Sequence, residues 1–174
     1  MKKIIILLLF LSFLTVYAEH EFGIAYTKGV NVSINLSSSG ELIKNLHGVK
    51  LEYTYRSILS TNSNFDLGTT TDLIFGKHKY FYGNQSYQTF LYPKLLIGLS
   101  HYLGSSKFSP IIGINMLLGL SVFGDDGSKD ATLGFRVYLN IPISKAPNFN
   151  SYLKLGAVLG VPVSSLFASA SFIF

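Results

Sequence analysis

Histidines are the side chains best suited to proton transfer near neutral pH, and here they lack the neighbours that a hydrolase needs. The chain has four of them, His20, His47, His78 and His101. Acyl hydrolysis requires a nucleophile beside a base that a third group orients. No Ser, His and carboxylate constellation can be recognised, no cysteine is present, and no cluster has metal-ligand spacing. We therefore expect no enzyme activity, no metal and no cofactor.

Charged residues at alternate positions form the second chemically capable group. Lys50 and Glu52 are separated by one apolar residue, and a spacing of two puts side chains on the same face of a strand. A hairpin turn centred on Thr61 would place Arg56 opposite Asp66 and Lys50 opposite Asp72. A register slip of two residues would keep the face and break both pairs.

Alternation of period two runs through the chain and predicts strands rather than helices. Residues 111–123 place Ile112, Ile114, Met116, Leu118, Leu120 and Val122 on one face, with Gly113, Asn115 and Gly119 on the other. Each segment meets or exceeds the roughly 9–11 residues that a tilted strand needs to cross a bilayer, the last one only just. The predicted strands are roughly 21–36, 46–58, 63–75, 86–103, 111–123, 131–144, 150–159 and 166–174.

The first residues have the pattern of a secretory signal peptide. Two lysines precede an apolar run over 4–14, and Val16 and Ala18 give the small-x-small pattern of a cleavage site. We expect residues 1–18 to be removed and 19–174 to form one domain; the alternative is a retained anchor helix. The mild positive charge of this domain does not point to nucleic acid.

Composition favours a membrane-facing barrel. Charged residues make up 13% of the chain, against about 25% in typical soluble domains. A soluble sandwich or barrel would turn its apolar faces inward, but the export signal and the low charge favour apolar faces outward. We predict an all-β fold: an eight-stranded, antiparallel, up-and-down transmembrane β-barrel. Its predicted lumen charges are Lys50, Glu52, Arg56, Asp66, Asp72, Lys94, Arg136 and Lys154.

These lumen charges have two interpretations. They could line a gated polar path, or they could pair and fill the barrel; the second is favoured because eight strands leave little interior room. The same phase predicts that Met116→Arg is more damaging than Asn115→Arg. Pro93 interrupts a predicted strand, where proline removes a ladder hydrogen bond, so we expect a β-bulge or a break there.

The connections divide into shorter and longer sets. Predicted periplasmic turns lie near 59–63, 104–107 and 144–149, and predicted external loops near 37–45, 76–86, 124–130 and 160–165. Lys77, His78 and Lys79 fall in an external loop and could bind lipopolysaccharide phosphates or a host surface. The favoured alternative is solvated lysines beside an aromatic girdle at the membrane boundary.

The last residues resemble the C-terminal insertion signal of Gram-negative outer-membrane barrels. Ala170, Phe172 and Phe174 alternate, and the last of them is aromatic. The chain resembles the small eight-stranded families: the OmpA membrane domain, the OmpX/Ail group and the OmpW group, also described as porin-like. This resemblance implies residence in the outer membrane, contact with its lipid and lipopolysaccharide, engagement by the barrel assembly machinery and a monomeric state.

From this resemblance we expect a structural or surface-interaction role. A narrow pore or carrier for small or apolar solutes is the second possibility, and an outer-membrane lipid hydrolase the third. The barrel-forming residues support the architecture far more strongly than any one of these roles.

Overall fold

The structure, a computed structural model, describes residues 18–30, 44–79, 85–123, 129–161 and 164–174. These residues form eight strands, and no helix among them is long and apolar enough to cross a membrane. The strands are β1 (Ala18–Val30), β2 (Lys44–Ile58), β3 (Ser63–Lys79), β4 (Gln85–Tyr102), β5 (Ile111–Phe123), β6 (Lys129–Lys145), β7 (Asn150–Val161) and β8 (Ser164–Ile173).

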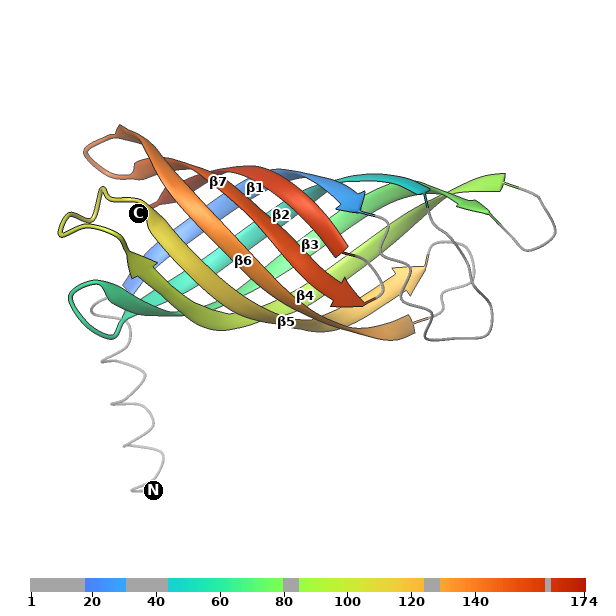
Figure 1. Cartoon of the computed structure of the whole chain (residues 1–174), viewed down its shortest axis with the longest axis horizontal. Coiled ribbons are helices and arrows are strands. Elements are labelled where there is room, and N and C mark those ends of the chain that lie inside the picture. Colours follow the sequence, from blue (N-terminus) through green and yellow to red (C-terminus); the bar gives the residue numbers. More distant parts are fainter. Residues whose placement is uncertain (1–17, 31–43, 80–84, 124–128, 162–163) are drawn as a thin grey trace, which may run out of the picture.

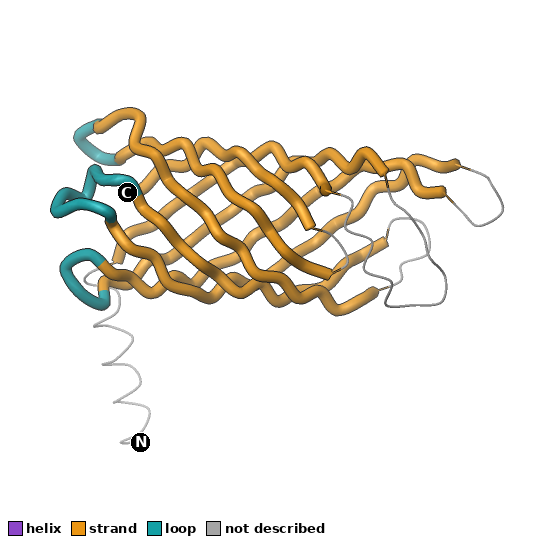
Figure 2. Tube along the Cα trace, in the orientation of Figure 1, coloured by secondary structure: helices purple, strands orange, loops and turns teal. Residues whose placement is uncertain are grey.

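Each strand pairs in antiparallel fashion with the next, and β8 pairs with β1 to close the barrel (Figure 1). Closure gives backbone groups a partner on both sides of a strand, which hydrocarbon surroundings require. The turns 59–62, 103–110 and 146–149 lie together at the end of the barrel near the C-terminus, here the turn end (Figure 2). The opposite end is the loop end. The predicted eight-stranded, up-and-down topology is confirmed.

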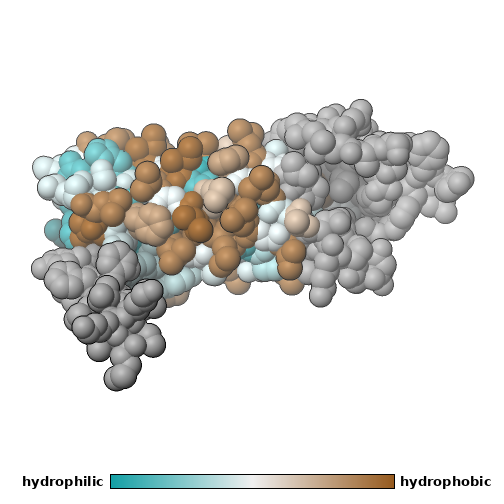
Figure 3. All heavy atoms as spheres, turned by 90° about the horizontal axis from the view of Figure 1, so that it is seen from below, coloured by the Kyte–Doolittle hydropathy of each residue, from teal (hydrophilic) through white to brown (hydrophobic). Residues whose placement is uncertain are grey.

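Apolar side chains cover the outside of the barrel. On β5, Ile114 is 54% exposed while its neighbour Asn115 is 1% exposed, and the alternation recurs along the other strands. Figure 3 shows hydrophobic residues across the middle of the described barrel and hydrophilic ones at the turn end. The predicted phase, apolar outward, is therefore confirmed. Such a surface matches a lipid environment rather than water.

Among the described residues, the interior combines charged side chains with two apolar clusters. One cluster is adjacent to the turn end and the other is farther along the barrel. Phe108, from the β4–β5 turn, packs against the first cluster. The first consists of Tyr102, Ile111, Tyr152 and Ile173, and the second of Ala25, Leu96, Leu117, Tyr138, Val158 and Phe167.

At the loop end, one predicted boundary needs correction and another falls outside the described residues. Strand β1 is described only as far as Val30, and the remainder of the predicted segment 21–36 lies outside the described residues. Strand β3 continues to Lys79 because it keeps pairing with β4, as far as the Lys79–Gln85 pair. The prediction that Lys77, His78 and Lys79 lie in a loop is wrong: their backbones belong to this strand.

Pro93 causes neither a bulge nor a break, contrary to the prediction. It lies opposite Thr71 in a continuous β3–β4 ladder, and β4 runs unbroken through it. The β4–β5 ladder omits Tyr92 and Pro93 but resumes in the same register at Lys94. The missing N–H is thus accommodated by a local gap in one ladder, without an inserted residue. Register shifts occur elsewhere, between Lys44 and His47 and between Pro142 and Ser144.

Candidate functional site

The β2–β3 hairpin brings opposite charges face to face inside the barrel. Arg56 pairs with Asp66 and Lys50 with Asp72, as the turn centred on Thr61 predicts. Arg56 Nε donates a 3.1 Å hydrogen bond to Asp66 Oδ1, and Lys50 Nζ lies 3.6 Å from Asp72 Oδ1. These ion pairs fix the register, because a shifted register would leave the charges unpaired inside the barrel.

A larger ion network grows from this hairpin across the lumen. Arg56 Nη2 lies 2.6 Å from Glu21 Oε2 of β1, and Lys154 Nζ of β7 lies 2.5 Å from both Glu21 Oε1 and Glu52 Oε1. Arg136 of β6 donates to Glu52. All members are buried. The neutral network, as we call it, has three cations and three carboxylates: Arg56, Arg136, Lys154, Glu21, Glu52 and Asp66.

Uncharged side chains complete the hydrogen bonding of the neutral network. Tyr138 Oη donates to Asp66 Oδ2 at 2.7 Å, and Ser100 Oγ donates to Asp66 Oδ1 at 2.8 Å. Asn115 Oδ1 accepts from Arg136 Nη2 at 2.6 Å. Asn115 is therefore part of the network, and Asn115→Arg would add a cation beside Arg136. That it is milder than Met116→Arg stays a prediction.

The neutral network fills the lumen rather than lining it. Its members come from β1, β2, β3, β6 and β7, so the ion pairs span the barrel from wall to wall. Isolated charges in such surroundings cost several kcal/mol each, whereas paired and hydrogen-bonded ones hold a fixed geometry. The favoured interpretation of the lumen charges, a filled polar core, agrees with this arrangement.

A second charge group lies on the loop-end side of the neutral network. Lys94 Nζ is 2.7 Å from Asp72 Oδ2, and Lys50 Nζ is 3.6 Å from Asp72 Oδ1. Lys50 Nζ also lies 4.1 Å from the centroid of the Phe167 ring, at cation–π distance. This group, Lys50, Asp72 and Lys94, is called the outer triad below. Every lumen charge predicted from the sequence is thus found inside the barrel.

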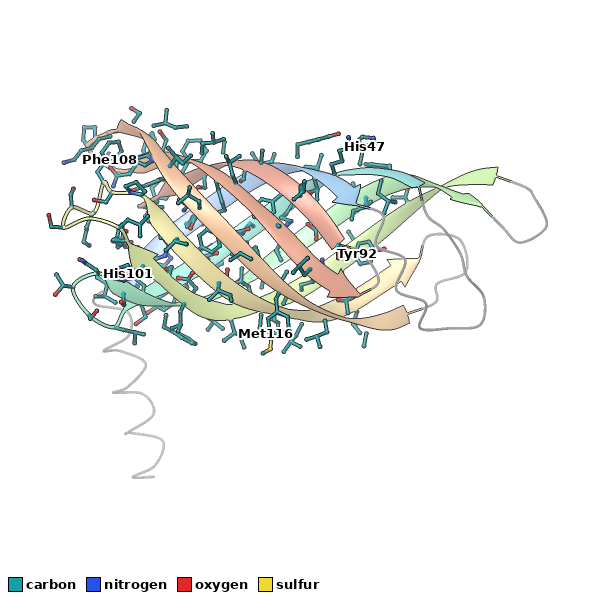
Figure 4. The ribbon with its side chains drawn as sticks, in the orientation of Figure 1. His47, Tyr92, His101, Phe108 and Met116 are labelled. Atoms are coloured by element: carbon teal, nitrogen blue, oxygen red, sulfur yellow. The ribbon has the colours of Figure 1, made fainter. Side chains whose placement is uncertain are left out.

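The turn end is closed by the β4–β5 turn. Phe108 lies at this end in Figure 4, with its ring 6.1 Å from that of Tyr152. Tyr152 Oη donates to the Lys107 backbone oxygen at 2.7 Å, while Lys107 Nζ lies 3.0 Å from Glu19 Oε1. Tyr102 Oη donates to Glu19 Oε2 at 2.5 Å. These contacts hold the turn across the mouth of the barrel.

Some site residues were not predicted. Glu19 and Glu21 are inward carboxylates that the sequence analysis does not include among the lumen charges, because the predicted first strand begins near residue 21, whereas β1 begins at Ala18. Their odd numbers place them on the same face as Gly23 and Ala25, and that parity was the available signal. Tyr138 lies two residues after Arg136, on the same inward face, but its partner Asp66 is 72 positions away, so the sequence does not indicate the contact.

The described histidine side chains lie on the outer surface, each beside a hydroxyl. His20 Nδ1 is 2.9 Å from Tyr53 Oη, His101 Nδ1 is 3.0 Å from Ser63 Oγ, and His47 contacts Tyr26 Oη. His47 and His101 are labelled in Figure 4, near the loop end and the turn end respectively. The Ser63–His101 contact was not foreseen, since it links two strands that the sequence does not place in register there.

The described residues contain no group of three or more His, Cys, Asp or Glu side chains placed to hold a metal ion. The side chain of His78 lies outside the described residues, as do those of Lys77 and Lys79. Their predicted binding role therefore stays a prediction.

The C-terminal residues lie on the outer surface of the seam between β8 and β1. Ala170, Phe172 and Phe174 are exposed, and the backbone N–H of Phe174 donates to His20 O at 2.9 Å. The Phe174 ring contacts those of Phe22 and Phe149 at centroid distances of 6.0 and 5.7 Å. Aromatic rings therefore gather at the turn end, where a membrane–water interface would lie.

Comparison with known proteins supports the fold. No protein-family model and no curated protein sequence matches the chain. Neisserial surface protein A has a similar solved structure, with a TM-score of 0.62 and 14% identity over 90% of this chain and 95% of that one. Ail of Yersinia pestis, in complex with the heparin analogue sucrose octasulfate, has a TM-score of 0.50 and 13% identity over 91% of this chain and 99% of that one.

The fold and the apolar outer surface define the class of this protein. It is a small eight-stranded antiparallel barrel with an apolar outer surface, and its fold is that of Neisserial surface protein A and Ail. Its interior contains ion pairs that join opposite walls, and a proposal about function must be consistent with them.

Proposed function

We propose that this protein is a closed outer-membrane barrel with a structural or surface-interaction role, and that its turn end faces the periplasm. The neutral network carries the proposal: three cations and three carboxylates, all buried, join opposite walls of the lumen. A solute path through the middle of the barrel would need these ion pairs to separate inside a poorly solvated interior, which is costly.

Reconstitution of the purified protein in planar bilayers tests the closed state. The sample is first verified as folded by its faster migration when unheated on a gel. We expect no stable conductance across a range of voltages. Large, long-lived openings in a verified sample would refute the closed barrel and favour the second candidate, a narrow pore.

The β3–β4 hairpin supports a surface role because it projects beyond its neighbours at the loop end (Figure 1). Pairing of β3 with β2 extends to Lys77, opposite Lys44, whereas pairing with β4 continues to Lys79. Three lysines therefore occupy neighbouring register positions at the base of the projection. Basic groups in such an array suit phosphorylated or sulfated polyanions, including lipopolysaccharide.

Binding of sucrose octasulfate and of lipopolysaccharide tests this surface role. The double variant Lys77→Gln, Lys79→Gln is compared with Lys107→Gln, Lys145→Gln, which removes the same charge at the turn end. We expect the first pair to weaken binding and the second to leave it near the original level. Equal affinities for both double variants would remove the hairpin from the proposal.

We also propose that the protein is not an enzyme. Ser63 Oγ and His101 Nδ1 lie 3.0 Å apart, but among the described residues no carboxylate is hydrogen-bonded to this histidine. A base without an orienting group is a poor activator of serine. Phospholipid hydrolysis is expected at background in both the original protein and Ser63→Ala. A hydrolytic rate that Ser63→Ala abolishes would contradict this.

A further inference from the structure

Among the side chains that the structure describes, the unbalanced charge of the lumen lies on the loop-end side of the neutral network. Lys50 is two residues beyond Glu52 along β2, on the same inward face. In the outer triad two ammonium groups, of Lys50 and Lys94, share the one carboxylate of Asp72. The described interior is therefore neutral at the network and carries one surplus positive charge at the outer triad.

The outer triad also has unused hydrogen-bonding capacity. Lys50 is 1% exposed, yet its Nζ has no hydrogen-bond partner; its nearest opposite charge is Asp72 Oδ1 at 3.6 Å. Asp72 Oδ2 is taken by Lys94 at 2.7 Å, whereas Asp72 Oδ1 has no donor. An ammonium group carries three donors, so the buried Lys50 Nζ is left with its hydrogen-bonding capacity unused.

Three buried threonines have hydroxyls without hydrogen-bond partners and occupy inward register positions near those of the outer triad: Thr27, Thr70 and Thr132. Thr70 lies opposite Lys94, and Thr27 lies opposite Gly48, the next inward residue from Lys50. Thr132 lies opposite Gly119, which in turn lies opposite Lys94. Tyr92, opposite Asp72, is labelled in Figure 4 and marks this part of the barrel.

We propose that Lys50, Lys94, Thr27, Thr70 and Thr132 form a binding site for a small oxyanion, such as inorganic phosphate or a phosphate monoester. The oxygens of the anion would accept hydrogen bonds from Lys50 Nζ and from the threonine hydroxyls, and its negative charge would offset the surplus positive charge of the outer triad. A protonated oxygen would also donate to Asp72 Oδ1. Bound water could serve the hydroxyls but would leave the charge unbalanced.

The other unpartnered atoms do not form a comparable site. Arg56 Nη1, Asn64 Nδ2, Asn140 Oδ1 and Ser171 Oγ lie around and below the neutral network, toward the turn end. Charges there are already matched, so isolated waters suffice. The proposal is independent of the surface role and of the closed lumen, because the outer triad lies on the loop-end side of the neutral network.

Calorimetric titration of the full folded protein in detergent with inorganic phosphate, at constant ionic strength, tests the site. The key variant is Lys50→Met, which removes the unpartnered ammonium group while Asp72 keeps Lys94 at 2.7 Å. We expect saturable binding by the original protein and at least a tenfold loss in Lys50→Met, as for a charge-assisted hydrogen bond. Thr70→Val is expected to lose less.

Lys145→Met is the matched control, because Lys145 is exposed at the turn end and its loss removes the same charge. It is expected to bind phosphate as the original protein does. Gel migration without heating verifies that each variant is folded. Two results would overturn the proposal: no saturable phosphate binding by the original protein, or equal affinities in Lys50→Met and Lys145→Met.

Discussion

Tyr138 lies directly opposite Gly113 across the β5–β6 pair, and its ring occupies the space that a side chain at position 113 would need. A Cβ built at Gly113 would lie 2.5 Å from Tyr138 Oη, the atom that donates to Asp66 Oδ2. The glycine therefore makes room for the ring that connects the wall of the barrel to the neutral network.

Gly113→Ala is expected to destabilise the barrel by about 1–3 kcal/mol, because the added methyl displaces Tyr138. Gly134→Ala is the matched change on β6, where the nearest atom to a built Cβ is Leu159 O at 3.2 Å. Urea unfolding in liposomes compares the two. A loss at Gly134→Ala as large as that at Gly113→Ala would show that the Tyr138 ring is not the reason.

Arg56→Met is expected to cost about 3–5 kcal/mol, because two buried carboxylates lose an ion pair and one of them, Asp66, keeps no cation, whereas Glu21 keeps Lys154. Those carboxylates are Glu21 and Asp66, at 2.6 and 3.1 Å. Lys107→Met, which breaks an ion pair whose lysine side chain is 69% exposed, is expected to cost at most about 1 kcal/mol.

Adding Asp66→Asn to Arg56→Met refines this measurement. The double variant is expected to lose less than the sum of the single losses, since the two residues act as a pair. Unfolding free energies from urea titration provide all the values. If Arg56→Met and Lys107→Met proved equally mild, the neutral network would not stabilise the fold.

Met116→Arg tests which surface meets lipid. Met116 points away from the barrel in Figure 4, in the middle part of β5. Arginine at a midplane lipid-facing position is expected to cost about 2–4 kcal/mol. Met116→Leu, which keeps the side chain apolar, is expected to change stability by less than about 1.5 kcal/mol. Comparable unfolding free energies for both variants would count against a lipid-facing Met116.

Phe174→Ala separates assembly from stability. Its ring makes two edge or tilted contacts, with Phe22 and Phe149, so removing it should affect folding in detergent only modestly. If the assembly machinery recognises Phe174, Phe174→Ala should lower the amount of folded barrel recovered from cell outer membranes much more than it lowers folding in detergent. Parallel losses in cells and in detergent would instead indicate a purely structural residue.

The strands and their phase were predictable because one side of each faces lipid, so alternation persists over many residues. The Arg56–Asp66 register was predictable because a short turn fixes which residues meet. Glu21, although on the correct parity, meets Arg56 only because β1 pairs with β2 across a long intervening segment. Such contacts depend on three-dimensional packing that local pattern does not encode.

The sequence predictions that the structure contradicts also failed for physical reasons. Lys77 and Lys79 were predicted to lie in a loop, yet β3 continues through both: Lys77 still pairs with Lys44 of β2, and pairing with β4 extends to Lys79. A bulge or a break was predicted at Pro93 because proline has no backbone N–H to donate. In the structure only the β4–β5 ladder is interrupted there, and the β3–β4 ladder is continuous. The Ser63–His101 contact joins residues 38 positions apart at the end of a hairpin, beyond the reach of a motif search.

The seam between β1 and β8 has a consequence for biogenesis. It joins residues as distant as Ile24 and Ser169, 145 positions apart, so it forms only after nearly every other strand is available. Until then β1 presents an open edge that can template pairing with a foreign strand. A chain that lacks β8 would therefore keep an unpaired β1 edge, which favours aggregation before the barrel closes.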